Sequence, residues 1–177
     1  PYICESHRLL IIPRQIIIDP HHVRLKMRKK ERSIKDRKDI DGIIRRCRVC
    51  RLAMSDDDQP YIIPLNFGYD GFCLYFHAAP EGRKIDILKR NNRVGFEFDI
   101  LHEILDAAQP CAWSAKYESV IGSGTAEIIN DVEGKKAALE CIMRQYGSDA
   151  GDFSEKVMKK TLIIRVRIRE ISGKARR

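Results

Sequence analysis

Long apolar runs are missing from this chain. The longest one, from Leu9 to Ile18, is interrupted by Pro13, Arg14 and Gln15. A helix that spans a bilayer needs about 20 consecutive apolar residues, and a secretory signal also needs a cleavage site of small residues. The sequence shows neither feature, so it predicts a cytoplasmic protein with no membrane partner.

Metal-ligand motifs are also scarce. Cys47 and Cys50 form one CxxC pair, but neither a second CxxC nor an HxxxH completes the four ligands of a zinc site. A chain of 177 residues, 44% of them apolar, can bury a core without disulfides, which predicts that its six cysteines are reduced thiols. We interpret the CxxC pair as two small residues where a helix passes into a strand, with a redox pair as the alternative. No metal site is predicted.

Aromatic residues make up only 7% of the chain and are absent from its two most basic segments. Residues 28–38 carry seven basic and two acidic residues, and residues 165–177 carry six basic residues and one acidic residue. A surface that binds nucleic acid usually combines positive charge with aromatic side chains on one face. We therefore interpret these segments as solvated ends or as a local binding site for an anionic ligand, and we predict no nucleic-acid partner.

The first 26 residues differ in composition from the rest of the chain. They contain Ile-rich runs and no methionine, whereas Met27 opens a basic stretch that leads into an amphipathic pattern. We expect residues 1–26 to be an extraneous or disordered extension and residues 27–177 to form one domain.

The pattern of that domain is mainly β, with flanking helices. The Asp70-Gly71 pair is a hairpin signal that would join residues 61–67 to residues 72–77. Residues 100–110 look like a connection, with His102 at the surface. Several antiparallel strands and few helices favour a small β-barrel. Strands are expected at 49–54, 61–67, 72–77, 94–98, 113–127 and 162–169, and helices at a segment ending near 46, at 83–91 and at 132–146.

Arg83 and Lys84 stand at the start of a predicted helix. The helix dipole disfavours cations at this end, so two of them together need an anion to offset their charge. Free backbone N–H groups with Arg and Lys make a phosphate cradle. The alternative is a pair of exposed cations on a solvated face.

Several short sequence segments resemble those of known proteins. They are PYIIPLNFGYDG at 60–71, LYFHAA at 74–79, EGRKID at 81–86, KYESVIG at 116–122 and ISGK at 171–174. Over residues 27–174 the chain resembles the pyridoxamine 5′-phosphate oxidase-related proteins and, within them, the nitroimidazole-resistance (Nim) branch. The resemblance implies an antiparallel FMN-binding split β-barrel that works as a homodimer, with flavin sites at the subunit interface.

The resemblance also implies which residues hold the cofactor. Backbone groups of one strand would line the flavin, a strand end would reach the ring or ribityl chain, and Arg83 and Lys84 would bind the phosphate. A further segment would come from a neighbouring strand or subunit. The full set is Ile62, Ile63, Pro64, Leu65, Asn66, His77, Ala78, Arg83, Lys84, Lys116, Tyr117, Ser119 and Val120.

His77 is the implied catalytic residue, beside the flavin and the substrate, with a purely structural role as the alternative. The chain ends in ISGKARR and lacks the Trp and His of the signature that grips vitamin B6 substrates. We therefore expect an FMN-dependent oxidoreductase that reduces a small acceptor such as a nitroaromatic, with the electron donor open. The alternative is a non-catalytic flavin or haem carrier or sensor of the same fold, in which His77 would be the best-placed axial ligand.

Overall fold

One antiparallel sheet organises the molecule. The computed structural model describes residues 29–149 and 152–177, so the extension expected at residues 1–26 lies outside the described part. The strand order is β3-β2-β6-β7-β8-β5-β4. β1 pairs with the C-terminal part of β8, on the same edge whose N-terminal part pairs with β5. The strands are β1 (Ser33–Ile34), β2 (Cys50–Asp56), β3 (Gln59–Leu65), β4 (Gly68–Tyr69), β5 (Cys73–Ala78), β6 (Arg93–Leu105), β7 (Ser114–Ile129) and β8 (Leu162–Arg176).

The sheet curls around a core but does not close, because β3 and β4 have no partner on their outer edges among the described residues. The inward side chains alternate along every strand, as in a barrel. Phe76, Phe98 and Leu52 are fully buried there. The predicted fold class, a split β-barrel, is confirmed.

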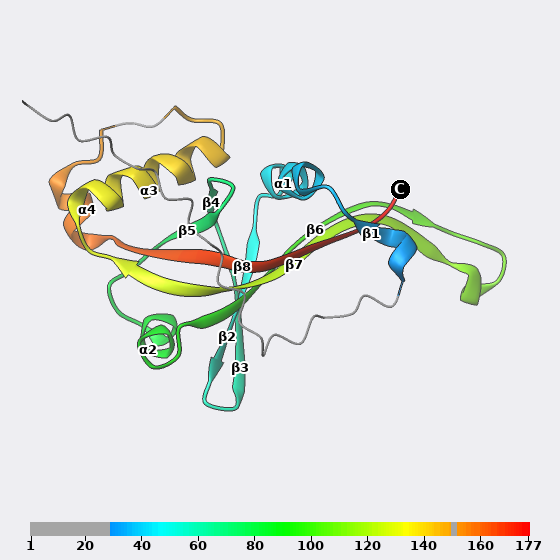
Figure 1. Ribbon diagram of the computed structural model, residues 1–177, viewed down its shortest axis with the longest axis horizontal. Helices are drawn as coiled ribbons and strands as arrows, with labels where there is room; N and C mark the ends of the chain where they lie inside the picture. The colour runs from blue at the N-terminus through cyan, green and yellow to red at the C-terminus, as the bar shows by residue number, and fades with distance from the viewer. Residues whose placement is uncertain (1–28, 150–151) are drawn as a thin grey trace, which may run out of the picture.

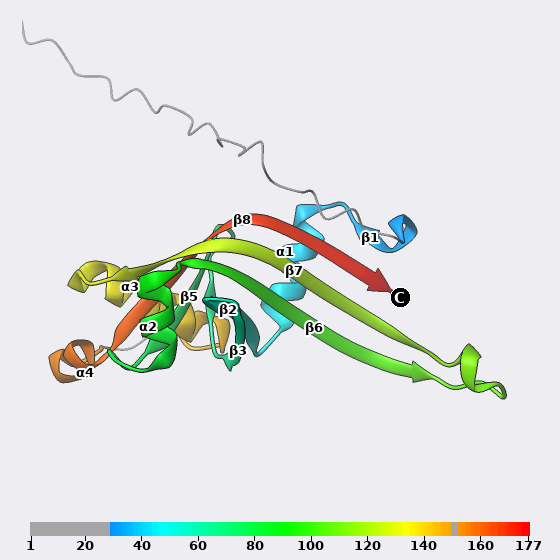
Figure 2. The same cartoon turned by 90° about the horizontal axis from the view of Figure 1, so that it is seen from below.

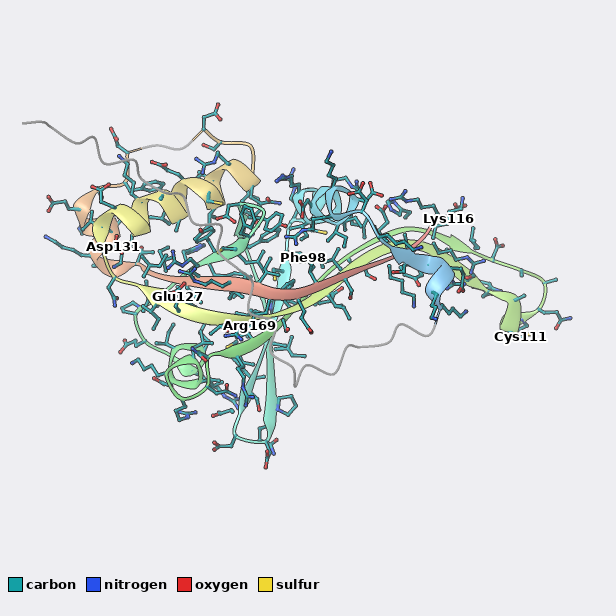
Figure 3. All side chains as sticks on the ribbon, in the orientation of Figure 1. Phe98, Cys111, Lys116, Glu127, Asp131 and Arg169 are labelled. Carbon is teal, nitrogen blue, oxygen red and sulfur yellow. The ribbon has the colours of Figure 1, made fainter. Side chains whose placement is uncertain are left out.

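Three long strands give the molecule its length. In Figure 2, β6, β7 and β8 run side by side, and the β6–β7 hairpin continues past the end of β8. The 3-10 turn η2 (Pro110–Ala112) lies at its tip, where Figure 3 labels Cys111. The connection expected at residues 100–110 is therefore wrong in its first half, because β6 runs to Leu105 after a bulge between Leu101 and Glu103.

Helices complete the core and cover one end of the outer face of the sheet. The apolar faces of α1 (Arg37–Arg46) and α2 (Arg83–Arg90) enter the main core. In Figure 1, α3 (Val132–Gln145) and α4 (Glu155–Lys160) lie together at the end opposite to the β6–β7 hairpin. Asp131 caps α3 as predicted, accepting a hydrogen bond from the Gly134 N–H at 2.7 Å. None of the helices in the described part of the chain is long and apolar enough to cross a membrane.

The predicted hairpin between residues 61–67 and 72–77 is only half right. The Asp70-Gly71 turn does form a hairpin, but it joins β5 to the two-residue strand β4. β3 pairs instead with β2, through the two-residue turn at Asp57 and Asp58. Alternation alone cannot show that a strand breaks after Leu65 and that the chain then crosses to the other end of the sheet order.

Candidate functional site

The residues implied by the resemblance fall on both faces of the sheet. Side chains directly opposite each other in an antiparallel pair share a face, so the strand register assigns each one. We call the face away from the main core the outer face. It carries Ile62, Pro64, His77, Tyr117 and Ser119.

The open edge of β3 offers backbone groups to a ligand. Proline has no N–H, so Pro60 and Pro64 fit positions whose backbone groups point away from β2. The two-residue turn between β2 and β3 gives the same result. It makes Asp56 and Gln59 a hydrogen-bonded pair, so every second residue of β3, beginning with Pro60, has backbone groups that do not bond to β2. Ile62 has the same phase as the two prolines. It therefore supplies the one outward N–H within β3 between Pro60 and Pro64, and its side chain is 62% exposed.

The start of α2 lies beside this strand. The Arg83 guanidinium stacks over the Tyr61 ring at 4.7 Å from the centroid, and its Nε lies 3.5 Å from the Asp56 carboxylate. Arg90 binds the other oxygen of that carboxylate. Arg83 is therefore held at the β2–β3 hairpin while most of its charge remains available to an anion.

The first turn of α2 is open to a ligand. Its N-cap, Gly82, has φ 119° and provides no side-chain acceptor for the first helical N–H groups. A Cβ built on Gly82 meets no atom within 4 Å, so the space in front of the turn is free. Unsatisfied N–H groups, the positive end of the helix and two adjacent cations fit a phosphate group.

The β7 segment does not join this cluster within one chain. β7 is separated from β3 in the sheet by β2 and β6. Lys116 forms an ion pair with Glu103 at 2.8 Å, and Figure 3 shows it on the β6–β7 hairpin near the C-terminal end of β8. Val120 is fully buried in the core. Only its backbone could therefore reach a ligand, whereas Tyr117 and Ser119 present side chains on the outer face.

His77 stands apart from the Arg83 cluster. It lies opposite Ile163 on β8, on the outer face near the small core under α3, and its side chain is exposed. Its imidazole forms no hydrogen bond or ion pair with another residue in the described ranges, so the ring remains available to a ligand. Its neighbour Ala78 faces the main core.

Asn66 has a structural role in the chain itself. Its amide donates to the Tyr146 hydroxyl at 3.0 Å, and that hydroxyl also accepts from the Phe67 N–H and donates to the Arg48 carbonyl. These bonds tie the end of β3 to the end of α3. The side chains of Ile63 and Leu65 pack against the main core, so their contribution to a ligand would be through the backbone.

One charged group that the sequence did not single out is deeply buried. Glu118 is 4% exposed and binds Arg46, His102 and Arg177. Burial raises the pKa of this carboxyl, but hydrogen bonds from His102 and Arg177 and the charge of Arg46 outweigh burial, and the pKa is lowered. The sequence signal was a glutamate at an inward position of an alternating strand, a position that requires a charged partner.

The Cys47–Cys50 pair lies where α1 passes into β2, as interpreted from the sequence. Both side chains are free thiols and buried. Burial raises the pKa of Cys47 to about 11 and raises that of Cys50 further, so both stay protonated at neutral pH. Protonated thiols are poor nucleophiles and poor metal ligands. Within the described ranges, no three His, Cys, Asp or Glu side chains are placed to hold a metal ion.

Solved structures share this architecture. A proposed 5-nitroimidazole antibiotic resistance protein of Bacteroides thetaiotaomicron is 36% identical, with a TM-score of 0.73 over 80% of this chain and 85% of that one. An FAD- and haem-binding protein of Mycobacterium smegmatis has a TM-score of 0.74 at 21% identity, over 81% of this chain and 73% of that one. The first confirms the resemblance to the nitroimidazole-resistance branch, and the second shows likeness of fold.

Sequence comparison gives the same assignment. An uncharacterized protein of Rhizobium meliloti (strain 1021) is 34% identical over 64 residues, which are 36% of this chain and 42% of that protein's length. This chain therefore spans less than half of that curated relative. Residues 36–175 match the family model described as pyridoxamine 5′-phosphate oxidase. The chain belongs to the pyridoxamine 5′-phosphate oxidase family.

Proposed function

We propose that this protein is an FMN-dependent oxidoreductase that works as a cytoplasmic homodimer and reduces a small nitroaromatic acceptor. The observation that carries the proposal is the position of Arg83, at the open first turn of α2 and beside the free edge of β3. In this arrangement, Arg83, Lys84 and the first turn of α2 would form a phosphate cradle next to a row of backbone donors and acceptors. A mononucleotide with a planar, polar ring requires these two features together.

The residues fit FMN in their chemistry. Arg83 and Lys84 with the first N–H groups of α2 would bind the phosphate. The Ile62 N–H and the outward carbonyls of β3 would hold the edge of the ring, and Ile62 would cover part of its face. Bound FMN supplies the electron transfer, and the protein's part is to orient the ring and exclude water from it.

A second subunit would complete the site. Tyr117 and Ser119 lie on the outer face, far along the sheet order from β3, so one chain cannot bring them to its own Arg83. The outer face also exposes Leu101 (59%) and Ile121 (45%) along with Ile62. Exposed apolar side chains on one continuous face are typical of an interface. Packing this face on a second copy would place the β7 segment of one subunit against the flavin of the other.

His77 is the proposed catalytic residue in this assembly. Its imidazole is exposed and has no hydrogen-bond partner in the described part of the chain. It could therefore donate a proton or a hydrogen bond to the acceptor during its reduction. The relative from Mycobacterium smegmatis binds both FAD and haem, so a haem carrier with His77 as axial ligand is an outcome that the test must separate.

The test is FMN binding by the double variant Arg83→Ala/Lys84→Ala. Each charge-assisted phosphate contact contributes about 1.5–3 kcal/mol, so we expect the Kd for FMN to rise at least a hundredfold. Fluorescence quenching of added FMN measures it directly. The matched control is Lys89→Ala in the last turn of the same helix, which should leave the Kd unchanged.

Unchanged FMN affinity in the double variant would refute the phosphate role. Purified wild type that carries a single Soret band, and takes up no FMN, would favour the haem carrier. Activity is tested separately, by oxidation of a reduced nicotinamide with a nitroimidazole as acceptor. His77→Ala should lower this rate while the Kd for FMN changes little.

A further inference from the structure

The two basic segments of the sequence meet in the fold. β1 pairs with the C-terminal half of β8, with Ser33 opposite Lys174. The 3-10 turn η1 (Lys30–Arg32) leads directly into β1. Figure 1 shows η1 and β1 beside the C-terminal end of β8. Cations that lie about 140 residues apart in the chain are thus gathered on one surface, which the sequence alone could not show.

These cations surround Tyr117 on the outer face. The register places Tyr117 opposite Arg176 and Ser119 opposite Lys174. The Lys174 Nζ lies 5.8 Å from the centroid of the Tyr117 ring. Arg32, from η1, lies close enough to the same phenol to lower its pKa. We call this surface the Tyr117 patch and define it by Arg32, Ser33, Tyr117, Ser119, Lys174 and Arg176.

The positive charges of the patch are not neutralised by ion pairs in the described part of the chain. Within residues 29–149 and 152–177, no carboxylate forms an ion pair with Arg32, Lys174 or Arg176. Asp99 faces Ser119 from β6, but it binds Arg51. Glu118, the neighbour of Tyr117 in β7, points to the opposite face.

The pKa of Tyr117 reflects the positive charge around it. Burial raises the pKa of Tyr117, but hydrogen bonds from Arg32 and Lys174 and their charges outweigh burial, and the pKa is lowered. A surface that favours the phenolate also favours other anions in its place. The hydroxyls of Ser33, Tyr117 and Ser119 add neutral donors to the three cations, which is the donor set that binds phosphate oxygens.

We propose that the Tyr117 patch binds the diphosphate of a dinucleotide that works at the flavin site. Three cations are enough to balance the two negative charges of a dinucleotide's diphosphate, and the Tyr117 ring supplies a flat surface beside them. This inference rests on the proposed function, because β7 faces the flavin of the other subunit only in the proposed dimer. The diphosphate has two possible sources, a reduced nicotinamide dinucleotide that donates electrons or FAD in place of FMN.

The first experiment uses ADP as the probe. Calorimetric titration of the full chain, with FMN in excess and at low ionic strength, measures its Kd. Lys174→Gln and Arg32→Gln should each weaken ADP about tenfold, because each removes one charge-assisted contact. Lys136→Gln on the exposed side of α3 is the matched control and should have no effect. Inorganic pyrophosphate should compete with ADP, and adenosine should not.

Tyr117→Phe keeps the ring and loses the hydroxyl, so it tests the patch without removing a cation. In wild type the phenolate absorbance should titrate below the usual tyrosine range, and bound ADP should move that midpoint upward. Failure of ADP to bind at millimolar concentration, or equal Kd values in all variants, would overturn the proposal.

FMN binding is measured on the same samples, so the two proposals fail separately. FMN binding with no patch-dependent ADP binding would overturn only the inference. Patch-dependent ADP binding in a protein that takes up no FMN would overturn the proposed function and, with it, the link between the patch and a flavin site.

Two further measurements assign the source of the diphosphate. A higher KM for the nicotinamide donor in Lys174→Gln, with kcat unchanged, would identify the donor. A loss of affinity for FAD but not for FMN in the same variant would identify the flavin. ADP binding with neither change would overturn the assignment to a dinucleotide.

Discussion

Glu118 shows what one buried carboxylate does in this barrel. It is held by Arg46 at the end of α1, by His102 at the bulge in β6 and by Arg177 beyond the end of β8. One side chain thus joins a helix, a hairpin and the C-terminal strand. Removing Glu118 takes the common hydrogen-bond acceptor from three half-exposed side chains, and removing one of those side chains leaves the buried carboxylate less compensated; either loss is more costly than that of an exposed pair.

The pH dependence of stability follows from the lowered pKa of Glu118. Its folded pKa lies below its unfolded value, so the ionised form stabilises the native state above the usual carboxyl range of about 4.3. That contribution is lost as the pH falls through the folded pKa. We expect Glu118→Gln to lower the free energy of unfolding at pH 7 by about 1–3 kcal/mol and to flatten its decline below about pH 4.

Urea unfolding of both proteins at a series of pH values measures this effect. Glu140→Gln is a suitable control, since Glu140 is a half-buried residue of α3 with one weak ion pair, 3.9 Å from Arg144. If Glu118→Gln and wild type lose stability in parallel as the pH falls, the carboxylate does not have this role.

At the scale of elements, the edge of β3 makes a prediction of its own. Ile62→Pro removes the outward N–H but none of the bonds from β3 to β2, because proline already occupies the positions two residues away on either side. We expect the free energy of unfolding to change by less than about 1 kcal/mol. The Kd for FMN should rise by about fivefold to tenfold, as for the loss of one neutral hydrogen bond.

Two variants give this comparison its controls. Ile62→Val keeps the N–H and should bind FMN as wild type does. Ile63→Pro removes an N–H that bonds to β2 and should destabilise the fold by about 3 kcal/mol. FMN affinity that is equal in Ile62→Pro and Ile62→Val would show that the ring does not use this donor.

Single elements were predicted from the sequence more reliably than their partners. Helix α3 could be located because Asp131 caps it and Gly147, at φ 86°, ends it. The Arg83-Lys84 start of α2 was correct because the spacing of Ile85 and Leu88, which indicates the helix, is a local pattern. The pairing of β5 with β8, and of β1 with β8, depends on contacts between distant segments that no local pattern contains. The Tyr117 patch was missed for the same reason.

At the scale of the whole molecule, the outer face predicts the assembly. Leu101→Glu and Ile121→Glu place a charge on the face proposed to pack on a second copy. Burial of an unpaired carboxylate costs several kcal/mol, so the double variant should weaken dimerisation by at least about a hundredfold. Light scattering should then give the chain mass of 20.5 kDa in place of twice that value.

Val132→Glu is the matched control, because Val132 is more exposed than Leu101 and Ile121 but lies at the start of α3, outside this face. It should remain a dimer. FMN affinity should fall together with dimerisation in the double variant, since each site is proposed to need both subunits. A monomeric wild type that binds FMN with full affinity would contradict the shared site.

The position of β8 in the sheet also determines the order in which the molecule can form. β8 lies between β7 and β5 and also pairs with β1, so it completes the contacts of three earlier segments at once. The β6–β7 hairpin can form from its turn outward, because its two strands are adjacent in the sequence. Ser33 can pair with Lys174 only after β8 has been synthesised. During synthesis, α1 and β1 would leave the ribosome long before their partner exists. This topology makes folding slow and leaves unpaired strand edges exposed in the meantime, which is when a chain of this kind is most open to chaperones and to aggregation.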